Sequence, residues 1–127
     1  MKKLGNQGIF MAKLGRAQWI RISSNGGYRF YKSCPRCCKH FGHLEYKFIF
    51  SWDGSSTWPD ARGSDFGITE KRVSKNNPFG AQSLCLPCRG NKGCTRGQKA
   101  NVLETMGRIE YGRWKDGDFE VSAGARE

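Results

Sequence analysis

The chain has 127 residues, a formal net charge of +11 at pH 7 and a hydrophobic fraction of 37%. This length suits one domain, and the low hydrophobic fraction predicts a thin core that needs a staple such as a metal ion or disulfides. No stretch has the roughly 20 apolar residues of a membrane helix, and the first residues lack the apolar run of a secretory signal. We therefore expect a soluble cytoplasmic protein without membrane contact. In that reducing compartment, the six cysteines favour metal ligation over disulfides.

The basic residues are concentrated in two stretches that contain no acidic residue. No aspartate or glutamate precedes Glu45, and none lies between Glu70 and Glu104. We call these stretches the first and second basic blocks, and together they contain all the cysteines. Charge distributed in this way favours a polyanionic partner such as a nucleic acid.

The N-terminal half predicts mainly strands. Residues 1–16 contain glycines and basic residues without periodicity, which predicts a flexible basic arm. Residues 17–32 predict a hairpin, because strand-like runs flank the turn sequence at 25–27. Alternation over residues 44–52 predicts a further strand. One face of that strand is expected to be aromatic and to form core; it consists of Tyr46, Phe48, Phe50 and Trp52.

The C-terminal half predicts short helices and a second hairpin. A loop over 58–67 precedes a short helix over 69–75, which Thr69 can cap. Residues 98–106 predict another helix. Residues 108–121 predict a hairpin around an Asp-Gly turn, and residues 122–127 are expected to be disordered.

Two Cys-x-x-Cys units provide the strongest chemical signal. They consist of Cys34 with Cys37, and Cys85 with Cys88. Each unit can direct two thiolates at one cation from a tight turn, and two units complete the tetrahedral sulfur shell that Zn²⁺ accepts. A shell of four protein ligands leaves no open position, so we expect one structural zinc ion. The fold class is therefore predicted as α+β: a single small β-rich zinc-binding domain over residues 17–121.

The remaining cysteines and the histidines leave alternatives open. Cys38 is adjacent to Cys37 and could replace it as a ligand, and His40 or His43 could give a Cys₃His shell. A second metal site could use Cys38, His40, His43 and Cys94. Otherwise Cys38 and Cys94 are thiols without a role in metal binding.

The second cysteine pair lies in a stretch that resembles a known family. Gln82-Ser83-Leu84-Cys85-Leu86-Pro87-Cys88-Arg89-Gly90-Asn91-Lys92-Gly93 is similar to the second zinc knuckle of HNH-type nucleases, above all the endonuclease VII-like branch of bacteriophage genomes. The resemblance implies a treble-clef-like fold. It also implies a metal-dependent endonuclease in which His43 and Asn91, with Asp60 or Asp65, would form the catalytic group.

The chain departs from that family at its catalytic step. The family has an Asp-His or His-His dipeptide, which is absent from this chain, and an Asn where this chain has Arg89. A nuclease of this class needs a histidine to activate water and further ligands to hold Mg²⁺. We therefore expect a protein without enzymatic activity, and keep an HNH-type endonuclease using His43 and Asn91 as the alternative.

The predicted function is that of a zinc-stabilised protein that binds DNA or RNA, either regulatory or part of a larger nucleic-acid-processing assembly. Lysine and arginine neutralise phosphates without reading sequence. The residues expected to do so are Arg29, Lys32, Arg36, Lys39, Lys71, Arg72, Lys75, Arg89, Lys92, Arg96 and Lys99. A further alternative is a phage-type adaptor whose basic face binds a host protein such as RNA polymerase.

Overall fold

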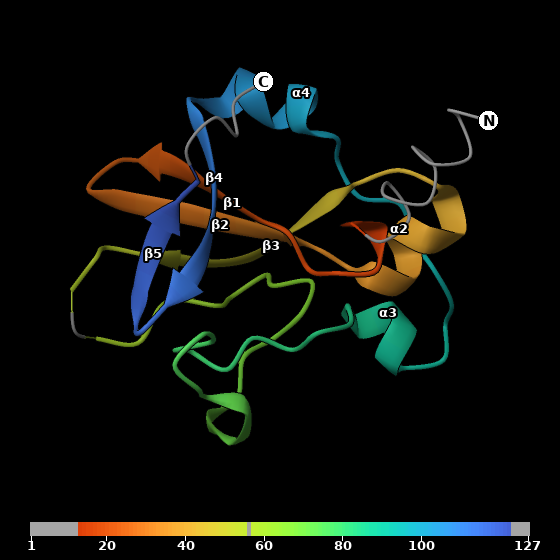
Figure 1. Cartoon of the computed structure of the whole chain (residues 1–127), viewed down its shortest axis with the longest axis horizontal. Helices are drawn as coiled ribbons and strands as arrows, with labels where there is room; N and C mark the ends of the chain where they lie inside the picture. Colours follow the sequence, from red (N-terminus) through yellow and green to blue (C-terminus); the bar gives the residue numbers. More distant parts are fainter. Residues whose placement is uncertain (1–12, 56, 123–127) are drawn as a thin grey trace.

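The structure, a computed structural model, describes residues 13–55 and 57–122, and its centre is a five-stranded antiparallel sheet (Figure 1). The strands are β1 (Trp19–Ser24), β2 (Gly27–Ser33), β3 (Tyr46–Trp52), β4 (Ile109–Lys115) and β5 (Asp118–Val121). Their order across the sheet is β3-β2-β1-β4-β5, because β4 pairs with β1 from the far end of the chain. Both predicted hairpins and the predicted third strand are confirmed, as is a small β-rich α+β domain.

The helices are short. They are α2 (Pro35–Phe41), α3 (Leu86–Arg89) and α4 (Ala100–Leu103), with 3-10 turns η1 (Glu70–Arg72) and η2 (Glu104–Met106). The helices predicted over 69–75 and 98–106 are therefore shorter than expected, and the second divides into α4 and η2. Among the described residues, no helix is long and apolar enough to cross a membrane.

A bulge in β3 overturns the expected single aromatic face. Phe30 pairs with Phe50, but the next residue, Tyr31, pairs with Phe48, so Ile49 is an extra residue on β3. Side chains alternate along a strand, and one inserted residue reverses the faces that follow it. Phe48 consequently packs in the cluster of Tyr31, whereas Phe50 packs in the cluster of Phe30.

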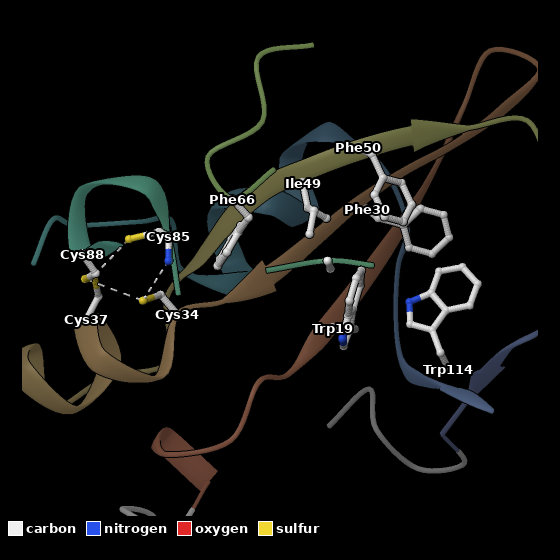
Figure 2. Packing of buried hydrophobic residues seen from close by; sticks show 11 residues of the cluster. Trp19, Phe30, Cys34, Cys37, Ile49, Phe50, Phe66, Cys85, Cys88 and Trp114 are labelled. Carbon is white, nitrogen blue, oxygen red and sulfur yellow. Dashed lines mark hydrogen bonds between the residues drawn. The ribbon is translucent and has the colours of Figure 1, made fainter. Parts of the chain in front are cut away.

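The two faces of the sheet carry two separate cores. The larger core contains rings at centroid distances of 5.1 Å for Phe30 and Trp114 and 5.8 Å for Trp19 and Trp114. This aromatic cluster continues through Phe66 to the four cysteines of the two Cys-x-x-Cys units (Figure 2). The smaller core, on the opposite face, includes Leu103 of α4. The cysteine cluster is thus part of the main hydrophobic core.

The structure describes only part of the predicted N-terminal arm and C-terminal tail. Of residues 1–16, the structure describes 13–16, and within these the Leu14 side chain is fully buried. The packed part of the protein therefore includes Leu14, which lies three positions before the predicted start of the domain at residue 17. The rest of the predicted arm, and residues 123–127 of the predicted tail, lie outside the described residues.

We predict that Phe30→Ala destabilises the fold by about 3–5 kcal/mol, because the fully buried ring would leave a cavity at the centre of the larger core. Denaturant unfolding followed by tryptophan fluorescence measures the change. Val102→Ala is the control, since Val102 is 44% exposed and should change stability by less than about 0.5 kcal/mol. Equal losses in the two variants would contradict the assigned core.

Candidate metal centre

The two Cys-x-x-Cys units adopt the same local structure. In each unit the first cysteine, Cys34 or Cys85, is the N-cap of a short helix, and the second, Cys37 or Cys88, lies in the first turn. A proline occupies the first turn of each helix, where its fixed φ suits a helix start and its missing N–H costs nothing. Residues three apart share a side of a helical turn. Each unit therefore presents two sulfur atoms in one direction.

The tertiary structure brings the two units together, although Cys37 and Cys85 are 48 positions apart (Figure 2). The Sγ–Sγ distances are 3.4 Å for Cys37 and Cys88, 3.6 Å for Cys37 and Cys85, and 3.9 Å for Cys34 and Cys88. A tetrahedral metal with bonds of about 2.3 Å to sulfur requires sulfur atoms about 3.8 Å apart. All four sulfurs lie within 4.8 Å of one another, so they can hold one metal ion.

The electrostatics of the four thiols favour a bound cation. Burial raises the pKa of the Cys34 and Cys88 thiols. Burial acts on Cys85 in the same direction, but a backbone hydrogen bond from Cys88 and a side-chain bond from Lys47 outweigh it and lower the Cys85 pKa to about 7. The protein's own groups therefore stabilise one thiolate, and a divalent cation would supply the charge that stabilises the others.

Lys47 is a buried cation in contact with the cysteine cluster. Its Nζ lies 3.2 Å from Cys85 Sγ and 3.6 Å from Cys37 Sγ, and it also donates to Thr95 Oγ1. Burial alone would lower the Lys47 pKa, but the bond to Cys85 raises it. Sequence reasoning missed this residue. One sequence signal could have indicated its burial: Lys47 lies two positions before the apolar Ile49, on the same face of the predicted strand.

Backbone amides complete the surroundings of the sulfur atoms. The Cys85 N–H donates to Cys34 Sγ and the Thr95 N–H donates to Cys37 Sγ, both at 3.4 Å. Such donors orient thiolates and spread their charge. The segment around Thr95 is thereby attached to the cysteine cluster.

Lys32 is a second buried lysine, and its position corrects one prediction. Only 2% of the residue is exposed, and Nζ donates to the backbone oxygens of Gln82 and Ser83 at 3.0 Å each. The ammonium also lies 4.0 Å from the Phe66 ring centroid. Burial lowers the Lys32 pKa to about 8. Lys32 therefore holds the chain that leads into the second cysteine pair, and a contact with nucleic acid is excluded by its burial.

The other cysteines and the histidines lie outside the cluster. Cys38 is buried, with its sulfur 3.4 Å from both the backbone nitrogen and the backbone oxygen of Glu45. Cys94 is half-buried beside a backbone carbonyl of α2, and His40 and His43 are exposed. Within residues 13–55 and 57–122, only the four-cysteine cluster brings three or more candidate ligands together. The alternatives of a Cys₃His shell and a second metal are therefore not formed there.

The candidate catalytic residues do not gather into a site. His43 and Asn91 are both exposed, and Asn91 has a left-handed backbone with φ 66°. The Asp60 carboxylate pairs with Arg62 at 2.8 Å. Across the described parts of the chain, no hydrogen bond or ion pair joins these residues to Asp65. The nuclease alternative stays a prediction.

Basic residues from both blocks lie on or next to the two helices that contain the cysteine pairs. Arg36 and Lys39 are exposed on α2, Arg89 is exposed on α3, and Lys92 follows it. Arg89 also donates to the backbone oxygens of Leu84 and Phe66. The convergence of the two cysteine pairs is what brings these four cations to one end of the molecule (Figure 1).

The remaining predicted contacts lie elsewhere or have partners within the protein. Arg96 pairs with the buried Glu45 carboxylate at 2.8 Å, and half-buried Arg29 lies over Phe48 at 4.2 Å. Three exposed residues, Lys71, Arg72 and Lys75, belong to η1 and the turn after it, apart from α2 and α3 (Figure 1). Lys99 is exposed before α4.

Comparison of the chain with models of protein families, with curated proteins and with solved structures finds no match. The resemblance of residues 82–93 to an HNH-type knuckle therefore rests on those residues alone. What the structure shows is a small β-rich domain whose four clustered cysteines can hold one metal ion.

We predict that the purified protein contains one metal ion per chain and that Cys34→Ser abolishes stoichiometric binding, since it removes one of four converging ligands. Elemental analysis of gel-filtered protein measures the content. Cys94→Ser, which changes a thiol outside the cluster, should retain one ion per chain. Equal metal contents in the two variants would contradict the assigned ligand set.

We predict that Lys47→Met weakens metal binding by about 10-fold or more, because the thiolates would lose their buried ammonium donor. Competition with a chromophoric chelator at pH 7 measures the affinity. Lys39→Met on the exposed side of α2 provides a matched charge change without contact to sulfur. An affinity loss as large in Lys39→Met would show that overall charge, and not the buried contact, is responsible.

Proposed function

We propose that this chain is a zinc-stabilised nucleic-acid-binding protein. One observation carries the proposal: four converging cysteines join two short helices that carry exposed cations from both acid-free stretches of the sequence. The metal centre would then be structural, and its consequence would be a continuous basic surface. We include the treble-clef-like arrangement in this proposal, supported by two cysteine pairs that each begin a short helix.

The donor set supports zinc as the metal. Four sulfur ligands in a tetrahedral arrangement are typical of zinc, or of iron in electron-transfer sites. All four cysteines are buried, and four protein ligands leave no coordination position for substrate or water. A stabilising role is therefore favoured over catalysis at the metal.

Charge supports a polyanionic partner. The chain carries +11, and Arg36, Lys39 and Lys92 are exposed without an ion-pair partner among the described residues. Cations of this kind bind phosphates by releasing condensed counterions, which gives affinity without sequence readout. Salt-dependent binding to DNA or RNA follows from this arrangement.

We predict that the protein binds labelled 20-mer oligonucleotides in low salt and that the double variant Arg36→Ala/Lys39→Ala binds at least about 10-fold more weakly. Each lost phosphate contact should also reduce the slope of log affinity against log salt by about one. Fluorescence anisotropy over a salt series, with DNA and RNA probes, measures both quantities.

The matched control is Lys71→Ala/Arg72→Ala, which removes the same charge from η1. Its slope should change less than that of the α2 variant. Undetectable binding of the wild type to every probe at low salt would refute the proposed function. A protein complex that survives nuclease treatment would instead favour the adaptor alternative.

A further inference from the structure

A pocket of about 470 Å³ lies next to the metal centre, between β2, β3 and the segment over residues 95–98. This volume lies in the range of roughly 300–1,000 Å³ that is typical of small-ligand sites. Residues that matter to its chemistry are Arg29, Tyr31, Lys47, Phe48, Asp65 and Arg96. The pocket therefore combines aromatic, cationic and anionic groups.

The Arg29 guanidinium is held in place on an aromatic support. Its central carbon lies 4.2 Å from the Phe48 ring centroid, and Nε donates to the Tyr31 hydroxyl at 3.1 Å. Tyr31 in turn packs edge-on against Phe48, with ring centroids 5.7 Å apart. A guanidinium fixed in this way offers a planar face on which a nucleobase can stack.

Arg29 is also the cation of this pocket that is free to take an anion. Arg96 is paired with Glu45, and Lys47 is bonded to sulfur. The terminal nitrogens of Arg29 make no hydrogen bond or ion pair within residues 13–55 and 57–122. Arginine donates hydrogen bonds to phosphate oxygens in the plane of the guanidinium. The edge of the Arg29 guanidinium can therefore bind a phosphate while its face stacks on a base.

Asp65 makes the pocket favour a ligand that has hydrogen-bond donors over a simple anion such as phosphate. Its side chain is exposed and lines the same space. A carboxylate repels inorganic phosphate, but it accepts hydrogen bonds from the N–H groups of a base or from a sugar hydroxyl. A ligand with an anionic group, hydrogen-bond donors and a flat ring matches these three features together.

We propose that this pocket receives one unpaired nucleotide of a single-stranded nucleic acid, an inference that rests on the proposed function. The base stacks on the outer face of the Arg29 guanidinium, and the adjoining phosphate accepts hydrogen bonds from its terminal nitrogens. A base paired within a duplex is already stacked and cannot enter such a pocket. The site therefore selects single strands over duplexes.

The metal centre shapes one wall of this pocket. Thr95 donates its backbone N–H to Cys37 Sγ at 3.4 Å, and Gly97 donates to the Glu45 carboxylate at 2.9 Å. Gln98 then exchanges backbone hydrogen bonds with Tyr46 of β3 at 2.7 and 2.8 Å. The wall segment is thus attached at successive points to the cysteine cluster and to the sheet.

Anisotropy titrations with a labelled 15-mer of deoxythymidine and with a mixed-sequence duplex of equal length test the proposal. We expect the single strand to bind about 10-fold more tightly than the duplex, and Arg29→Ala to lose about 10-fold in affinity for the single strand alone, because one stacked base is worth that much. Arg29→Lys keeps the charge but lacks the planar face, so it should lose nearly as much.

Arg108→Ala is the matched control, because Arg108 is exposed and does not line the pocket. If Arg29→Ala and Arg108→Ala lose the same affinity, or if Arg29→Lys binds like the wild type, the pocket assignment is wrong while the proposed function stands. If the wild type binds neither probe, the proposed function itself fails. Metal content and unfolding midpoint verify each variant, and Arg29→Lys decides the question if Arg29→Ala does not fold.

Discussion

Four buried thiols within 4.8 Å of one another create the constraint on which the rest of this structure depends. Thiolates at such distances repel one another, and burial opposes their ionisation. A shared cation offsets both the repulsion and the cost of ionisation. It also crosslinks Cys37 and Cys85, which are 48 positions apart. The cysteines belong to the same buried cluster as the aromatic residues of the larger core, so the crosslink and the hydrophobic packing support each other.

Two buried lysines extend that constraint into the surrounding chain. Lys47 from β3 contacts the sulfur atoms directly, and Lys32 from β2 donates to the two carbonyls that precede Leu84 and the second cysteine pair. Burying an ammonium is costly unless its hydrogen bonds are satisfied. These two lysines satisfy theirs with the segments that form the metal centre. The sheet and the second cysteine pair are in this way connected by polar as well as apolar contacts.

The metal centre matters for the proposed function because it positions basic residues and one wall of the pocket. Basic residues distributed over both acid-free stretches become neighbours because the cysteine pairs converge. The 95–98 segment becomes a pocket wall because Thr95 contacts Cys37 and Gln98 pairs with Tyr46 of β3. The same centre therefore organises a surface of exposed cations on α2 and α3 and a separate pocket with an oriented guanidinium. In the proposed function, the first would attract the phosphate backbone and the second would hold a single base.

The sequence by itself determined the features that depend on neighbours along the chain. The hairpin turns follow from residues that accept a positive φ, such as Gly26 and Gly117, and the cysteine spacing predicts the ligand set because a helical turn aligns residues three apart. Helix α2 was not predicted, although Pro35 at its start and Gly42 at its left-handed end are local signals for a helix.

The tertiary structure alone decided the rest, because it depends on which distant segments become neighbours. The bulge at Ile49 arises from the pairing of β3 with β2, and it divides an apparently uniform aromatic face between two cores. Lys32 is indistinguishable in sequence from an exposed lysine. Its partners are the Phe66 ring and two carbonyls that lie 50 and 51 positions away along the chain. Whether a charged side chain is buried depends on the groups that contact it. When those groups are far away along the chain, the sequence near the residue gives no sign of the burial.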